Sequence, residues 1–127
     1  MFVGPVELAD PTLLLSADQQ SLLWLAEQIE SRQMTYLRRG YPEFVVSEAH
    51  LTLIPVEGAG RLEERRGQYE WRIGPEQARE FAERLRMLAT APKPAHAYLD
   101  TDSARQIVAS KGEYDLKRLI ADQPPGD

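Results

Sequence analysis

The sequence contains no cysteine among its 127 residues. This absence excludes a disulfide framework, a thiolate zinc site and a cysteine nucleophile, and it favours a reducing compartment. Long apolar runs are also missing. No segment approaches the roughly 20 apolar residues of a membrane span, and residues 1–9 lack the basic start and apolar stretch of an export signal. We therefore expect a cytoplasmic protein with no membrane partner.

Positive charge is scarce, with 15 lysines and arginines against 20 aspartates and glutamates, which gives a formal net charge of −5. Binding a polyanion is driven by lysine and arginine side chains that displace counterions, so we expect no nucleic acid partner. The deficit lies in residues 1–31, which hold five acidic residues and no lysine or arginine. This acidic region predicts a basic or mixed-charge protein as the partner.

The composition, with 43% hydrophobic and 28% charged residues, is that of a globular protein. A chain of this length buries enough surface for one hydrophobic core. We predict a single α+β domain over residues 1–122, and no internal repeat is visible. Residues 123–127, which contain two prolines and a glycine, are predicted to be a disordered tail.

Two amphipathic helices are predicted. Ser16 is expected to cap the first, which ends between Ser31 and Arg39. The second begins at Pro75 and ends before Pro92. The apolar stripe of the first helix comprises Leu22, Leu25, Ala26 and Ile29, and that of the second comprises Ala78, Phe81, Ala82, Leu85, Leu88 and Ala89.

Other segments alternate between apolar and polar residues in the manner of β-strands. They are residues 3–8, 44–56, 69–73, 95–99 and 105–110. Residues 62–66 form either a short strand or a loop, and Leu116, Leu119 and Ile120 predict a short terminal helix. The order βαββαββ predicts a mostly antiparallel sheet of four to five strands with both helices on one face. The first six elements also match a ferredoxin-like fold.

No catalytic motif stands out. The serines lack the glycine-flanked turn that usually presents a nucleophile, and no glycine-rich phosphate loop is present. His50 and His96 lie on separate predicted strands and would form a metal site with Asp100 or Asp102 only if those strands were neighbours. Neither histidine has a metal-ligand spacing, so we interpret both as ordinary surface or edge-strand residues. We predict no enzyme activity, no catalytic residue, no metal and no cofactor.

Trp24 lies nearly opposite the apolar stripe of the first helix, on a face that it shares with Gln20 and Glu27. Either the N-terminal strand or a C-terminal segment covers it, or it is the exposed anchor of an interface inside an acidic rim. The charged tip at residues 62–66 is a second candidate surface. The predicted protein-binding residues are Gln20, Trp24, Glu27, Glu30, Glu63, Glu64 and Arg65.

Two further groups admit a functional and a structural interpretation. Arg32, Arg38 and Arg39 would either receive a carboxylate or phosphate or complement a helix C-terminus. Trp71 alternates with Tyr69 and is predicted to belong to the core.

Two short segments resemble small bacterial immunity proteins, which neutralise polymorphic or contact-delivered toxins. They are Ser16-x-Asp18-Gln19 running into residues 21–26, and His96-x-Tyr98-Leu99-Asp100 followed by Asp102-Ser103 and Ile107-Val108. The resemblance touches about a third of the chain. It implies an acidic α+β protein that binds a toxin domain, steered by charge, and covers its active site. It transfers no binding residue to this chain.

Three functions remain open from the sequence. The first is a non-enzymatic protein-binding domain, specifically an immunity-type inhibitor of a basic toxin domain. The second is a ferredoxin-like dimeric module that regulates or binds a small ligand. The third is a small hydrolase or isomerase, which would need His50 or His96. The sequence leaves open whether the chain is a monomer or a homodimer.

Overall fold

The computed structural model describes residues 1–100 and 103–114 of the chain. These residues form eight strands and two helices. The strands are β1 (Phe2–Glu7), β2 (Pro11–Ser16), β3 (Thr35–Leu37), β4 (His50–Pro55), β5 (Leu62–Arg65), β6 (Gln68–Ile73), β7 (Ala95–Asp100) and β8 (Gln106–Lys111). The helices are α1 (Gln19–Glu30) and α2 (Pro75–Ala89). The predicted terminal helix around Leu119 and the predicted tail lie outside the described residues.

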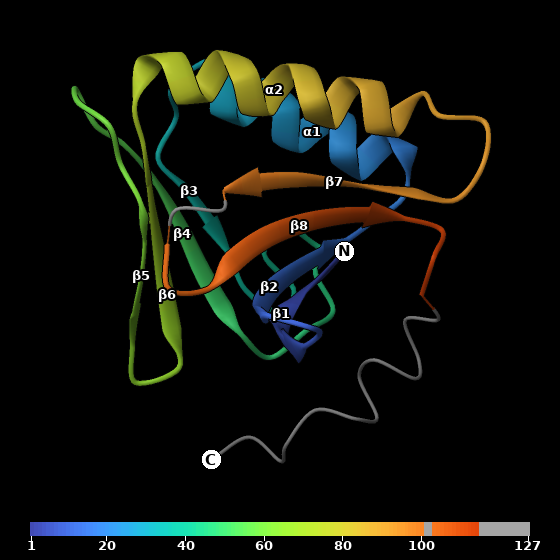
Figure 1. Cartoon of the computed structure of the whole chain (residues 1–127), viewed down its shortest axis with the longest axis horizontal. Coiled ribbons are helices and arrows are strands. Elements are labelled where there is room, and N and C mark those ends of the chain that lie inside the picture. Colours follow the sequence, from blue (N-terminus) through green and yellow to red (C-terminus); the bar gives the residue numbers. More distant parts are fainter. Residues whose placement is uncertain (101–102, 115–127) are drawn as a thin grey trace.

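The strands form two four-stranded sheets in place of the single sheet that the sequence predicted. Sheet A has the order β1-β2-β8-β7 and sheet B the order β3-β4-β6-β5. The central pair of each sheet is parallel and the outer pairs are antiparallel. Figure 1 shows both helices side by side above the strands. The α+β class is therefore confirmed, whereas the order βαββαββ, the mostly antiparallel sheet and the ferredoxin-like arrangement do not match the structure.

Two strands, β2 and β3, were not predicted from the sequence, each for a different reason. Strand β2 lies inside sheet A, and its three consecutive leucines are buried, so it has no alternation to recognise. Strand β3 lies within residues 31–39, where the predicted end of the first helix was left open, because Met34, Tyr36 and Leu37 can also continue a helical period. The predicted strand over residues 44–56 shortens to β4, whereas the ambiguous segment at 62–66 forms β5.

The ends of α1 differ from the prediction. Asp18, and not Ser16, caps the helix: its Oδ1 accepts a hydrogen bond of 2.8 Å from the N–H of Ser21. Ser16 instead ends β2 and is buried. The last helical residue is Glu30, one position before the predicted range. Arg32 then turns the chain with a φ of 60°. Its guanidinium donates to the backbone carbonyl of Val56, which follows β4, and to that of Ile73, the last residue of β6.

The chain consists of two halves with the same topology, β1-β2-α1-β3-β4 and β5-β6-α2-β7-β8. The hairpin β1–β2 corresponds to β5–β6, the parallel pair β2–β8 to β6–β4, and the antiparallel pair β7–β8 to β3–β4. Each sheet therefore takes two strands from each half. This arrangement has an approximate twofold axis that relates the two halves.

Equivalent residues of β2, α1 and β4 in the first half and of β6, α2 and β8 in the second are separated by 56 positions, the separation of Glu30 and Arg86. The offset aligns buried residues of the helices with one another and core residues of the paired strands with one another. The helix pairs are Leu22 and Ala78, Leu25 and Phe81, Ala26 and Ala82, and Ile29 and Leu85. The strand pairs are Leu13 and Tyr69, Leu15 and Trp71, Leu51 and Ile107, and Leu53 and Ala109.

One hydrogen bond occurs once in each half. The N–H of Val3 donates to Ser47 Oγ at 2.8 Å, and the N–H of Leu62 donates to Ser103 Oγ at 2.9 Å. Ser47 and Ser103 are themselves equivalent by the same offset. Val3 pairs with Leu15 of β2, and Leu62 pairs with Trp71 of β6. Because Leu15 and Trp71 are equivalent, Val3 and Leu62 occupy equivalent positions. The repeat thus extends from topology to a specific hydrogen bond, although few residue identities are shared.

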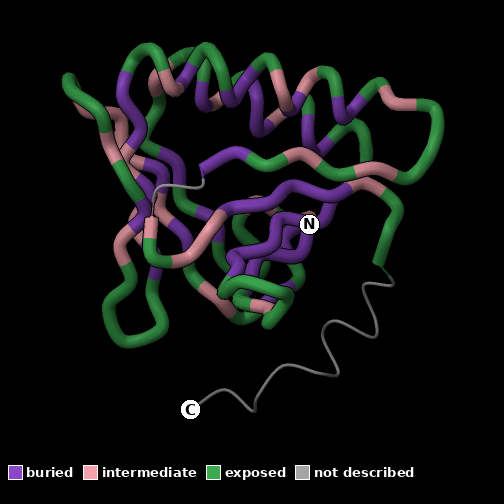
Figure 2. Tube along the Cα trace, in the orientation of Figure 1, coloured by how far each residue is buried: buried purple, intermediate pink, exposed green. Residues whose placement is uncertain are grey.

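A single hydrophobic core lies between the helices and the inner faces of both sheets. Figure 2 shows buried residues along the side of each helix that faces the strands. Trp71 is fully buried, as predicted, and its ring packs on Phe81 with centroids 5.1 Å apart. Its indole N–H donates to Asp100 at 3.3 Å, which joins sheet B to sheet A.

Replacing the repeated serines is expected to destabilise the fold unequally. Ser47→Ala leaves the buried N–H of Val3 without its acceptor, which costs about 1–3 kcal/mol of unfolding free energy. Ser103→Ala costs less because Ser103 is only partly buried and water can replace its hydroxyl. Urea denaturation measures both, with the exposed Ser31→Ala as a control that changes stability little. A Ser47→Ala protein as stable as this control would contradict the assigned contact.

The cap at Asp18 predicts a pH-dependent stability. The hydrogen bonds from Ser21 hold the pKa of the Asp18 carboxyl below its ordinary value of 3.8. The contribution of the carboxylate is therefore present above that value and is lost as the pH falls through the lowered pKa of the folded state. Asp18→Ala should lower the free energy of unfolding at neutral pH by about 0.5–2 kcal/mol.

Asp18→Asn is the matched variant, because asparagine caps a helix without titrating. Its stability should lie close to that of the unmodified protein at neutral pH, and its acid unfolding should lack the contribution from position 18. Denaturation midpoints measured between neutral pH and about pH 2 test this. An equal loss in the Ala and Asn variants would be inconsistent with a capping role.

Candidate functional site

The predicted binding residues do not form one surface. Gln20, Trp24, Glu27 and Glu30 belong to α1, in the helix layer. The remaining residues, at positions 63–65, lie on β5. Figure 1 shows the tip of the β5–β6 hairpin pointing away from the helices. The acidic helix face and the charged tip are therefore separate places on the molecule.

Trp24 is half-buried and packs against the hydrophobic core. Its ring meets the ring of Phe44 edge to face, with centroids 5.2 Å apart and an interplanar angle of 80°. Phe44 lies in the loop between β3 and β4, a cover that neither sequence interpretation named. This packing leaves less of the tryptophan available as an interface anchor.

The acidic face of α1 is partly neutralised within the chain. Both carboxylate oxygens of Glu30 accept hydrogen bonds from the guanidinium of Arg86 on α2, at 2.6 and 2.9 Å. This bidentate pair lowers the pKa of Glu30 and raises the pKa of Arg86. Gln20 and Glu27 remain exposed. Glu30 therefore links the two helices and offers little charge to a partner.

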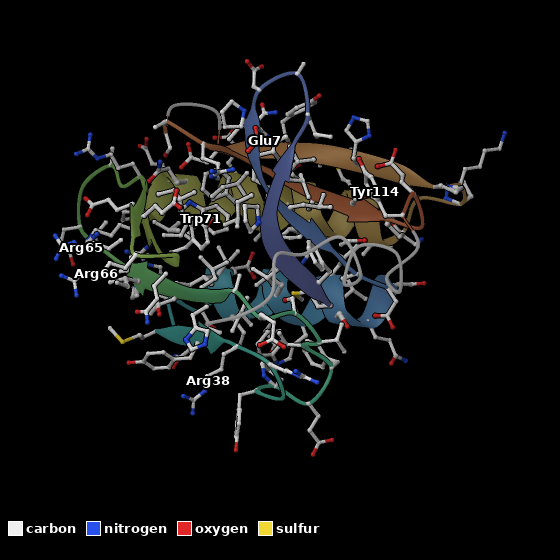
Figure 3. All side chains as sticks on the ribbon, turned by 90° about the horizontal axis from the view of Figure 1, so that it is seen from below. Glu7, Arg38, Arg65, Arg66, Trp71 and Tyr114 are labelled. Carbon is white, nitrogen blue, oxygen red and sulfur yellow. The ribbon has the colours of Figure 1, made fainter. Side chains whose placement is uncertain are left out.

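The glutamates of β5 also have partners inside the chain. Glu63 pairs with Arg72 at 3.1 Å, and Glu64 lies 3.5 Å from Arg105. Glu64 accepts a hydrogen bond of 3.4 Å from the Tyr69 hydroxyl, whose pKa is raised by burial. Arg65 forms no ion pair within the described residues. Figure 3 shows it projecting outward from the hairpin tip.

The two histidines lie on strands that are not neighbours. His50 is on β4 in sheet B, whereas His96 is on β7 in sheet A, so the condition for a shared metal site is not met. Within residues 1–100 and 103–114, no group of three or more histidine or acidic side chains is arranged to hold a metal. His96 Nδ1 lies 2.9 Å from Glu113, which also accepts from Ser110 Oγ at 2.7 Å. Glu113 thus separates the serine from the histidine.

The three arginines after α1 do not converge on a common ligand position. Arg32 donates to backbone carbonyls, and Arg39 pairs with the carboxylate of Glu48. Arg38 lies over the ring of Tyr41, 4.7 Å from its centroid. Figure 3 shows Arg38 on the outside of the molecule, beyond the end of β3.

An exposed aromatic surface surrounds β3, a strand that was not predicted because it lies where the end of the first helix was left open. Tyr36 and Tyr41 are each 62% exposed and Met34 is 53% exposed. The Tyr36 hydroxyl donates to the sulfur of Met34 at 3.2 Å. We call Met34, Tyr36, Arg38, Tyr41 and His50 the β3 surface. Its aromatic residues could have been found from the sequence only by recognising a strand of three residues.

A hollow of about 230 Å³ adjoins the β3 surface on the outer face of sheet B. Its lining includes Tyr36, Arg38, His50, Thr52, Gln68 and Glu70. Leu37 pairs with Leu51, so the next residue, Arg38, lies beside His50. His50 pairs with Gln68, and Gln68 pairs with Arg65, so the four residues form one row across sheet B. Arg38 and Arg65 place a positive charge at each end of this row.

The chain matches no protein-family model, and no curated protein or solved structure matches it significantly. Neither helix of the described part is both long and apolar enough to cross a lipid bilayer. The functional argument therefore rests on the surfaces themselves.

The contact between Trp24 and Phe44 predicts an energetic coupling. Replacing each ring by alanine, singly and together, should reveal a coupling energy of about 0.5–1.5 kcal/mol in a double-mutant cycle. Urea denaturation supplies the four stabilities. Additive losses would mean that the rings do not stabilise one another and that Trp24 is free to serve as an anchor.

Proposed function

We propose that this protein is a non-enzymatic protein-binding domain that contacts its partner through the β3 surface. The exposure of Met34, Tyr36 and Tyr41 is the observation that carries the proposal. Large apolar side chains that lie together on a surface are typical of protein interfaces, and tyrosine is enriched among the residues that dominate binding energy. Arg38 adds a cation that stacks on an aromatic ring and also suits an interface.

The specific form of this proposal is an immunity protein that binds and neutralises a bacterial toxin in the cytosol. The resemblance of two sequence segments supports it. The net charge of −5 supports it as well, because a negative protein attracts a basic toxin domain at long range. Glu27 and Gln20 on α1 are exposed and available for a second contact. We do not carry the ferredoxin-like module further, because the single sheet on which it relied does not form.

Site-specific crosslinking tests the β3 surface directly. A photoreactive phenylalanine analogue placed at Tyr36 should form a covalent adduct with one protein in cells of the source organism. The same analogue at Met87 is the matched control, since Met87 is an apolar side chain on α2 and is 68% exposed. An adduct at position 36 and none at position 87 is the expected result.

The crosslinked protein is then purified and titrated against the unmodified chain and Tyr36→Ala. Loss of the tyrosine should weaken binding by about tenfold or more, as is usual for an aromatic interface residue. Protection of cells from growth arrest by that protein would support the immunity form. Equal adducts at both positions, or an unchanged affinity of Tyr36→Ala, would show that the β3 surface is not the interface.

A further inference from the structure

A second row of side chains crosses the outer face of sheet B, next to the row that joins Arg38 to Arg65. Tyr36 on β3 pairs with Thr52 on β4, and Thr52 pairs with Glu70 on β6. The two residues that flank Thr52 along its strand belong to the hydrophobic core. Because side chains alternate between the two faces of a sheet, this row faces away from the core. Its three side chains all line the hollow beside the β3 surface.

The size of the hollow suits one protruding side chain. Its volume is about 230 Å³, whereas pockets for small molecules usually span about 300–1,000 Å³. Such pockets are mostly apolar, but polar side chains from three strands line this one. The occupant that fits is therefore a polar or charged side chain of the partner protein.

Three groups in the hollow favour a cation. Oε2 of Glu70 lies 3.3 Å from Arg72, whereas its Oε1 accepts no hydrogen bond from the residues that the structure describes. The Thr52 hydroxyl can accept another hydrogen bond. The ring of Tyr36 is exposed, and no cation or second ring of the described residues packs on it. A positive group beside this ring would gain a cation–π interaction as well as the carboxylate.

A second glutamate strengthens the negative charge at this end of the row. Glu63 on β5 lies directly opposite Glu70, and like charges in this arrangement destabilise a sheet. One arginine serves both carboxylates: Arg72 lies 3.1 Å from Glu63 and 3.3 Å from Glu70. Arg61 lies 3.9 Å from Glu63 and is largely exposed. A further cation beside Glu70 would therefore be attracted to the pair.

The basic residues of the hollow belong to the neighbouring row. Arg38 exchanges backbone hydrogen bonds with Tyr41, and its guanidinium lies over the Tyr41 ring, 4.7 Å from the centroid. The charge of Arg38 is therefore directed toward the loop after β3. His50 lies beside Arg38 in the same row. The positions next to Tyr36 and Glu70 are left to a partner.

The other half of the chain indicates that the fold itself does not require this polar row. The residues equivalent to Glu70 and Thr52 are Leu14 and Val108, which pair with one another in sheet A. Both are buried, although neither belongs to the main core cluster. Apolar side chains therefore suit these positions of the fold. The carboxylate and the hydroxyl are features of sheet B alone, which favours a specific role for them.

We propose that the hollow receives an arginine side chain of the partner protein, with its guanidinium between the ring of Tyr36 and the carboxylate of Glu70. Arginine suits this place better than lysine, because its planar group stacks on an aromatic ring and forms a forked pair with a carboxylate. This inference rests on the proposed function. It agrees with a basic partner, since it assigns one positive residue of that partner to a specific position.

Short peptides test the hollow without knowledge of the natural partner. The probe is a glycine–serine peptide with blocked ends and one central arginine. Matched peptides carry lysine, or citrulline, which has the shape of arginine without its charge. In a nuclear magnetic resonance titration, the arginine peptide should shift the amide signals of Thr52 and Glu70 in a saturable way. It should bind about threefold more tightly than the lysine peptide and about tenfold more tightly than the citrulline peptide. Equal binding of the arginine and citrulline peptides, or no shift at these two amides, overturns the proposal.

Charge-matched variants separate the hollow from general attraction to an acidic protein. Glu70→Gln should weaken binding of the arginine peptide by about tenfold. Glu83→Gln removes the same charge from an exposed position on α2 and should leave the affinity unchanged. Tyr36→Leu keeps an apolar side chain but removes the ring, and should weaken binding by about threefold. Melting temperatures confirm that the variants fold. Equal losses in the Glu70 and Glu83 variants would contradict recognition by the hollow.

The outcomes distinguish this inference from the proposed function. If position 36 crosslinks to a partner that binds Glu70→Gln as tightly as the unmodified chain, the β3 surface is an interface but the hollow does not receive an arginine. If the arginine peptide does not bind and position 36 yields no specific adduct, both proposals fail.

Discussion

The exchange of strands between the two halves is the constraint on which this structure depends. Strand β2 completes its sheet by pairing with β8, and β4 does so by pairing with β6. Neither half therefore contains a whole sheet or a closed core. The helices α1 and α2 pack on one another above the sheets and hold the halves together. The position of β3 at one end of sheet B follows from the same arrangement, because β3 pairs with β4 and the other half of the chain supplies β6 and β5.

The features that could be predicted from the sequence are those with a local period. The stripe of α2 through Phe81 and Leu85 is buried as expected, and so is the alternating trio of β6 that contains Trp71. The two strands of the antiparallel pair β7–β8 were likewise predicted. In the α2 stripe and the β6 trio the pattern of burial repeats within a few residues, so a short window of sequence contains the whole pattern.

The features that could not be predicted depend on contacts between distant residues. The leucines of β2 are buried on both faces of a central strand, which removes the alternation. The partner of Trp24 is Phe44, from a loop with no regular pattern. The repeat itself is hidden because equivalent positions share burial and not identity, as Leu25 and Phe81 do. The β3 surface was missed because β3 has only three residues and is recognised as a strand only through its pairing with the distant strand β4.

The ion pair between Glu30 and Arg86 has a consequence for the symmetry of the molecule. These residues are equivalent positions that touch one another, so they lie at the axis relating the halves. Two identical ββαββ chains assembled in this way would place the same residue on both sides, and a glutamate facing a glutamate or an arginine facing an arginine would repel. Opposite charges can meet at this point only when the two halves carry different residues there, as Glu30 and Arg86 do in this chain. The pair thus favours the joined, asymmetric molecule over an assembly of two halves with the same charge at this position.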